Sequence, residues 1–246
     1  MKLKQQFKQL STLLIAFLAL VTVTAAAPAE GVRKTAVVSF GLSGEQDVFR
    51  SEATGAASIV ARRFGADPVI VRFNTRKSGD ATVEALAATL ETAAKRIEPS
   101  SDVLFLILTS HGSPDGLEVT AGRRRTTLTP SNLADMLDRT GVRHKVVIIS
   151  ACYSGVFIPR LATADTLVIT AADANHPSFG CEDRAKWTYF GDAFFNAALR
   201  QSATLRDAFM VARSLILRRE QRNGFEPSHP QMAGGANVEP LLVPRR

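Results

Sequence analysis

Residues 104–116 read LFLILTSHGSPDG, an apolar run that ends on Ser-His-Gly. Such a run is typical of a strand buried on both faces of a sheet. His111 then supplies a titratable ring, and Gly112 permits backbone geometries that other residues avoid. Two interpretations are open: the strand reaches the surface and turns into a hairpin at SPDG, or a functional site begins at His111.

A second segment has the same form and ends on a thiol. Residues 145–155 read KVVIISACYSG, in which Cys152 follows the apolar run 146–149. Short apolar stretches of this kind, separated by helical patterns of ten or more residues, predict an α/β fold with a mainly parallel sheet covered on both faces. The other expected strands are 34–40, 68–73, 102–108 and 166–170, and the expected helices are 46–64, 81–97 and 130–139, with two more within 191–218.

The expected sheet brings the two reactive side chains to one edge. Sites in open parallel sheets form at the carboxyl ends of the strands, where both His111 and Cys152 emerge. A thiol with a pKa of about 8.5 is only partly ionised at neutral pH, and a nearby imidazole can accept its proton or stabilise the thiolate. The main-chain amides of Gly112 and Cys152 can supply two donors to an oxyanion. Acyl transfer through a thioester uses these groups together.

These motifs carry a resemblance to a known family. A strand ending in His-Gly, followed 41 residues later by a strand ending in Ala-Cys with Ser-Gly beyond it, resembles the legumain-like cysteine peptidases. That family includes asparaginyl endopeptidases and the catalytic subunit of the GPI transamidase, within the caspase-like superfamily. The resemblance implies a caspase-like three-layer sandwich, with Cys152 as nucleophile and His111 as general acid/base.

The resemblance also implies a substrate-binding set. The segment 166–199 resembles the family stretch that follows the nucleophile, which maps Ser178 beside the specificity pocket and Asp192 at its base. Upstream, DVFRSEA at 47–53 maps Arg50 onto a basic pocket residue. An Arg-Asp pair offers a donor and an acceptor to a side-chain amide, so the resemblance implies cleavage after Asn or Asp, by hydrolysis or by transfer to an amine.

One position departs from the family pattern. Legumain-type enzymes place an Asn two residues before the pocket Arg to orient the catalytic His, and Val48 stands there in this chain. A backbone carbonyl or the adjacent Asp47 is the expected substitute. The long inhibitory C-terminal domain of the eukaryotic enzymes is not recognisable in the sequence.

Residues 1–29 have the layout of a secretory signal peptide. Three lysines precede an apolar stretch from Leu10 to about Val23, and small residues with A-x-A spacing follow. We therefore expect cleavage after Ala29, a peptidase domain over residues 30–246, and a periplasmic or extracellular protein without stable membrane insertion. The alternative is an uncleaved anchor, for which the apolar stretch is short. Removal of the three lysines lowers the formal charge from +7 to +4.

Partners and cofactors follow from what remains. The basic run at 123–125 lacks interleaved aromatic residues, so we expect no nucleic-acid binding, and a protein or peptide is the expected substrate. The four histidines and two cysteines show no metal-ligand spacing, and no strand is followed by a phosphate-binding glycine loop, so we expect no metal and no cofactor.

The second cysteine leaves an alternative open. Two cysteines in an exported chain suggest a disulfide between Cys152 and Cys181, which would block the nucleophile. With Val48, this possibility keeps a catalytically inactive, peptide-binding relative of the same fold as the alternative function.

Overall fold

The fold is built on strands that are apolar along their whole length. This computed structural model describes residues 33–242, and the segment for which a signal peptide is expected lies outside them. The central strands β1 (Thr35–Gly41), β3 (Val103–Thr109), β7 (His144–Ser150) and β8 (Thr166–Thr170) are almost entirely buried. Strands of this kind need helices on both faces of the sheet, because successive side chains point to opposite sides.

The main sheet has six strands in the order β2-β1-β3-β7-β8-β9. The first five strands are parallel, with β2 (Val69–Phe73) at one edge. At the other edge, β9 (Gln231–Gly234) runs antiparallel to β8. The Pro-rich tail around His229 thus leads into an edge strand. Its four residues show no clear apolar alternation, and the strand was not predicted.

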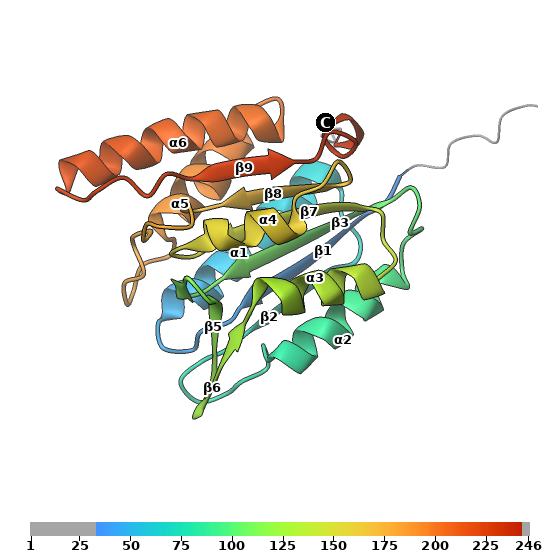
Figure 1. Cartoon of the computed structure of the whole chain (residues 1–246), viewed down its shortest axis with the longest axis horizontal. Coiled ribbons are helices and arrows are strands. Elements are labelled where there is room, and N and C mark those ends of the chain that lie inside the picture. Colours follow the sequence, from blue (N-terminus) through green and yellow to red (C-terminus); the bar gives the residue numbers. More distant parts are fainter. Residues whose placement is uncertain (1–32, 243–246) are drawn as a thin grey trace, which may run out of the picture. The chain divides into compact units, whose positions relative to one another are not determined.

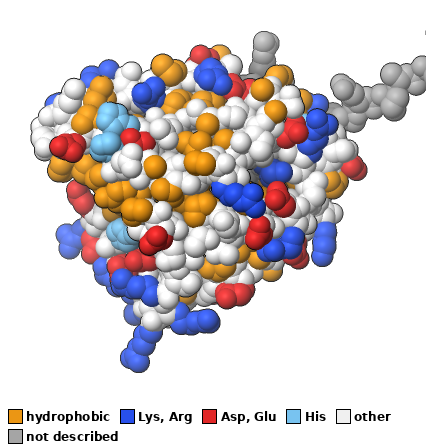
Figure 2. Space-filling view, in the orientation of Figure 1, with side chains coloured by type: hydrophobic (Ala, Val, Ile, Leu, Met, Phe, Trp, Pro, Cys, Tyr) orange, Lys and Arg blue, Asp and Glu red, His pale blue; other side chains and the backbone are white. Residues whose placement is uncertain are grey.

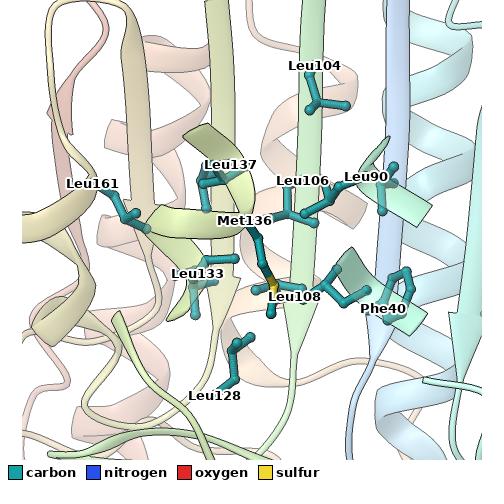
Figure 3. Packing of buried hydrophobic residues seen from close by; sticks show 14 of the residues in the cluster. Phe40, Leu90, Leu104, Leu106, Leu108, Leu128, Leu133, Met136, Leu137 and Leu161 are labelled. Carbon is teal, nitrogen blue, oxygen red and sulfur yellow. The ribbon is translucent and has the colours of Figure 1, made fainter. Parts of the chain in front are cut away.

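Two hydrophobic clusters lie on the two faces of this sheet. On one face, leucines of β3 pack against α2 (Val83–Ala94), α3 (Pro130–Arg139) and α4 (Ile158–Leu161), as Figure 3 shows for Leu106, Leu137 and Leu161. On the other face, the alternate residues of β3 pack against α1 (Asp47–Phe64), α6 (Leu205–Arg222) and the segment between them in space, α5 (Tyr189–Gly191) with η2 (Asp192–Ala197) and η3 (Ala198–Arg200). The result is the expected three-layer sandwich.

The helix boundaries follow from local capping. Thr82 begins α2 and Thr129 begins α3, each by accepting a hydrogen bond from a backbone N–H three residues on. Thr204 and Asp207 form a capping box at the start of α6. The helix α1 ends at Gly65, which has the left-handed conformation that favours glycine.

A small second sheet stands beside the carboxyl ends of β3 and β7 (Figure 1). It consists of β4 (Gly112–Ser113), β5 (Gly116–Ala121) and β6 (Arg124–Leu128), all antiparallel. The hairpin expected at SPDG is its first turn. Short 3-10 turns η1 (Ser154–Phe157) and η4 (Glu239–Leu241) complete the described elements. Within residues 33–242, no helix has the length and apolarity needed to cross a bilayer.

Candidate active site

His111 and Cys152 leave the sheet side by side. The strands that precede them, β3 and β7, are hydrogen-bonded neighbours, and their last residues Thr109 and Ser150 are paired in register. Each reactive residue lies two positions beyond this pair. The backbone continues the pairing for one step, since the Ser110 N–H donates to the Ser150 carbonyl at 3.2 Å. The expected juxtaposition at the carboxyl edge is therefore present.

Gly112 is required at the junction of the two segments. A Cβ atom placed on Gly112 would lie 2.0 Å from the carbonyl oxygen of Cys152, well inside any allowed contact. No residue with a side chain fits there without moving the backbone. The close approach brings the main chain after His111 against that of Cys152, the region in which the two oxyanion donors were expected.

Gln46 holds the imidazole of His111. Its Oε1 lies 2.7 Å from His111 Nε2, and Phe49 packs edge-on against the ring at a centroid distance of 4.9 Å. With the amide oxygen facing the ring, Nε2 donates and Nδ1 is the nitrogen left to accept a proton from a thiol. A residue just before α1 therefore makes the ring contact that was expected from a substitute for the family's Asn.

The expected substitutes for that Asn lie elsewhere. Val48 is fully buried in the core, and the Asp47 carboxylate forms an exposed ion pair with Arg50 at 3.3 Å instead of contacting the ring. Sequence reasoning missed Gln46 because the family pattern was read at a fixed position. One feature of the sequence could have identified Gln46: it lies at the start of the expected helix and so near the strand ends.

The thiol of Cys152 is held by the backbone of Ser178. The Ser178 N–H lies 3.3 Å from Sγ, and Sγ lies 3.3 Å from the Ser178 carbonyl oxygen. The Ser178 hydroxyl is farther away, at 4.0 Å. The thiol thus donates to the Ser178 carbonyl and accepts from the Ser178 N–H, and these two contacts fix the position of the sulfur.

The turn after Cys152 explains why Tyr153 and Gly155 follow it in the sequence. Tyr153 has a positive φ of 53°, and its N–H donates to the His176 carbonyl at 3.0 Å. A Cβ on Gly155 would lie 2.5 Å from the backbone of Asp173 and Ala174. The turn is therefore packed directly on the segment 173–178, which carries Ser178. Positive φ at a residue other than glycine is uncommon and clusters at functional sites.

The segment 173–178 itself contains one histidine, His176, and a second, His229, packs against it. His176 Nδ1 is within 2.8 and 2.9 Å of the two Asp173 carboxylate oxygens, and its ring packs against His229 at 4.9 Å. The pKa of Asp173 is lowered, because hydrogen bonds from Asn175 and His176 outweigh the opposing effect of its partial burial. Figure 2 shows histidine side chains among apolar and charged ones on the face of the molecule that it draws.

Each of the three expected substrate-binding residues has contacts of its own. Ser178 lies at the nucleophile. Arg50 pairs with Asp47 and lies over the Phe73 ring, with its guanidinium 6.0 Å from the ring centroid. Asp192 accepts from Asn196 at 2.9 Å and pairs with Arg219 at 3.3 Å. Within the part of the chain described, no hydrogen bond or ion pair joins Arg50 to Asp192, so a shared Asn-binding pocket stays a prediction.

A cleft of about 280 Å³ lies on the His111 side of the site. It is lined by one face of the small sheet, with Glu118, Arg125 and Thr127 beyond His111 and Gly112. A larger cavity of about 460 Å³ lies between the opposite face of that sheet and the helices α2 and α3. His111 and Gly112 line the smaller cleft and not the larger cavity, and Cys152 lines neither of them.

Cys181 is a free thiol of different character. Both Cys152 and Cys181 are reduced in the structure. Burial, with a smaller contribution from the neighbouring Cys152 and Glu52, raises the pKa of Cys181 to about 12. Among residues 33–242, no group of three His, Cys, Asp or Glu side chains has the geometry to hold a metal ion.

Comparison with known proteins adds to this geometry. The family model described as the Peptidase C13 family matches residues 79–236, more than half of the chain. Among solved structures, the chain is similar to the crystal structure of caspase-1 from Spodoptera frugiperda. The TM-score is 0.55 at 13% identity, over 82% of this chain and 86% of that one. This likeness shows a caspase-like fold. A search of curated proteins found no match.

Proposed function

The chain belongs to the Peptidase C13 family, the legumain family of cysteine peptidases, and from this premise we propose that it is an exported endopeptidase that acts through Cys152 and His111. Cys152 attacks the scissile carbonyl and forms a thioester as the carbon–nitrogen bond breaks. His111 takes the thiol proton and gives it to the leaving amine. Water or a second amine then releases the acyl group.

The observation that carries this proposal is the register of β3 and β7. Thr109 pairs with Ser150, two residues before His111 and Cys152, and the backbone of Gly112 approaches the Cys152 carbonyl closely, which supports a joint role for the two residues. Gln46 on Nε2 leaves Nδ1 for the thiol. The family match alone would support a cysteine peptidase without naming these residues.

Preference for Asn or Asp before the cut is the finer part of the proposal. It rests on Ser178 beside the thiol and on Arg50 and Asp192 at the positions that the family uses. Asp192 is already paired with Arg219, and Arg50 with Asp47. Substrate binding must therefore rearrange these exposed ion pairs, which cost little to break because each is worth about 0–1 kcal/mol.

The test is a peptide library that varies the residue before the cut, with mass spectrometry of the products and labelling of Cys152 by an electrophilic Asn peptide. We expect cleavage after Asn and Asp, a covalent adduct on Cys152, and loss of both in His111→Ala. A preference for Lys or Arg before the cut would show that Arg50 does not belong to the specificity pocket. The absence of both adduct and cleavage in the reduced wild type would refute the peptidase hypothesis.

Two sequence features favour an inactive relative, and the geometry of the site weakens both. The place of the missing Asn is taken by Gln46, and both cysteines are free. Export rests on the N-terminal pattern alone, and the expected mature N-terminus at Glu30 can be checked by sequencing the protein recovered from the producing cells.

A further inference from the structure

Glu52 is a carboxyl group with no exposed surface, in the second turn of α1. Its Oε1 accepts a hydrogen bond from Thr109 Oγ1 at 3.0 Å, and its Oε2 accepts one from the Thr188 N–H at 2.8 Å. Ser150 also hydrogen-bonds to it, and the Ser150 hydroxyl lies 3.1 Å from that of Thr188. Burying a carboxyl is costly, and an apolar side chain would fill the same space at no such cost.

The partners of Glu52 are the residues that set the active site. Thr109 and Ser150 are the paired last residues of β3 and β7, two positions before His111 and Cys152. Thr188 begins α5, the short helix that leads to Asp192. One side chain from α1 therefore joins the two strand ends that carry the reactive groups to the helix start beside the expected specificity residue.

The backbone around the carboxyl is shaped to receive it. A Cβ on Gly191 would lie 2.0 Å from Glu52 Oε2, so only glycine lets the helix start reach the carboxyl. One turn further along α1, a Cβ on Gly55 would lie 2.6 Å from the Trp187 ring. Two glycines thus allow α1 and the segment 187–191 to approach closely on either side of Glu52.

We propose that Glu52 is a positioning residue, whose hydrogen bonds fix the separation of His111 from Cys152 and of both from the segment 188–192. This inference rests on the proposed function. No hydrogen bond joins Glu52 to either reactive side chain among the described residues, so it acts through Thr109, Ser150 and Thr188. A misplacement of about 1 Å can lower a rate by about 100-fold. The larger effect is therefore expected on kcat, which depends on the spacing of His111 and Cys152, and a smaller one on KM through the segment that leads to Asp192.

The test compares two replacements of nearly equal volume. Glu52→Gln keeps one oxygen that accepts from the Thr188 N–H. Its NH₂ group can donate a hydrogen bond to the Thr109 hydroxyl oxygen. Glu52→Met removes both acceptors. We expect Glu52→Gln to retain kcat within about 3-fold. We expect Glu52→Met to lower kcat and the rate of Cys152 alkylation by iodoacetamide by about 30-fold or more, with a change in KM of less than about 3-fold. Rates are expressed per folded molecule, with the folded fraction taken from circular dichroism.

Asp102 provides the matched control. It is another buried carboxyl, which accepts from the Lys34 and Glu98 N–H groups at 2.8 and 2.7 Å, but it precedes β3 at the edge of the sheet opposite the site. Asp102→Leu removes two comparable hydrogen bonds and is expected to lower the melting temperature while preserving kcat. Equal losses of kcat in Asp102→Leu and Glu52→Met would mean general destabilisation and would overturn the proposal.

Thr109→Val serves if Glu52→Met does not fold. It removes only the hydroxyl that Glu52 binds, and we expect kcat to fall about 5-fold, corresponding to one hydrogen bond of about 1 kcal/mol. Wild-type kcat in this variant, or in a folded Glu52→Met, overturns the proposal. If the wild type alkylates at Cys152 but cleaves no peptide, the proposed function fails, and the ratio of alkylation rates still decides the role of Glu52.

Discussion

At the scale of single residues, the site depends on atoms that have almost no room to move. Gly112 is the clearest case, because its missing Cβ would overlap the Cys152 carbonyl oxygen. We expect Gly112→Ala to lower kcat by about 100-fold, since the backbone of His111 and Cys152 must separate. The matched control is Gly122→Ala at the hairpin tip of the same small sheet, where nothing lies within 4 Å of the added methyl group.

The control carries a cost of its own, which the measurement must separate. Gly122 has a φ of 60°, so alanine there costs about 1 kcal/mol of stability through backbone strain. Steady-state kinetics with thermal melts of both variants resolve the two effects. Wild-type kcat in Gly112→Ala would mean that the contact at the junction is not needed for chemistry.

The orienting residue for His111 gives a second prediction. Because Gln46 Oε1 is bonded to Nε2, Gln46→Leu frees the ring to rotate, and we expect kcat to fall about 10-fold with little change in KM. Asp47→Ala, one residue along, removes only an exposed ion pair and should leave kcat near the wild-type value. A larger loss of kcat in Asp47→Ala than in Gln46→Leu would mean that Asp47, and not Gln46, orients His111.

Sequence patterns predicted much of this, and where they failed the reason is local. The positions of His111 and Cys152 follow from strand ends, which apolar runs mark plainly. Gln46 and Glu52 were missed because their contacts depend on how the start of α1 is oriented relative to the sheet. An acid among helix formers, such as Glu52, has the same pattern whether it faces solvent or the core. Only the packing of α1 on β3 and α5 decides between them.

At the scale of elements, the segment after β8 makes the two cysteines unequal. It holds Cys152 Sγ against the Ser178 N–H, while it partly buries Cys181, and this desolvation raises the pKa of Cys181 to about 12. We expect iodoacetamide at pH 8 to label Cys152 and leave Cys181 unmodified until the protein unfolds, because only thiolates react. Peptide mapping of the labelled protein, native and in denaturant, is the measurement.

The same experiment bears on the disulfide. In denaturant, labelling of neither cysteine before reduction, and of both after it, would show that the exported protein carries a disulfide between them. Labelling of Cys181 first would contradict the burial that we assign to it. A Cys152→Ser variant is the control, because it should show no labelling of the native protein at all.

At the scale of the whole molecule, buried groups tie the site to the stability of the fold. Glu52 joins β3, a central strand of the sheet, to α1 and to the start of α5, which cover one face of that sheet. A change at this carboxyl is therefore felt by the global unfolding equilibrium as well as by the site. Desolvation raises the pKa of Glu52 above its usual 4.5, and the hydrogen bonds from Ser150, Thr188 and Thr109 oppose that rise only in part.

The raised pKa fixes the sign of a pH dependence. The folded protein holds the Glu52 proton more tightly than the unfolded chain, so its stabilising contribution is complete below about pH 4.5 and is lost as the pH rises through the folded-state pKa. Glu52→Gln cannot titrate. The free energy of unfolding of the wild type minus that of Glu52→Gln should thus fall as the pH rises above 4.5, by up to about 1.4 kcal/mol per pH unit. Urea unfolding at a series of pH values measures this difference, in which the titrations common to both proteins cancel. Parallel curves for the two proteins would show that the pKa of Glu52 is the same in the folded and unfolded states, so that its hydrogen bonds fully offset the desolvation.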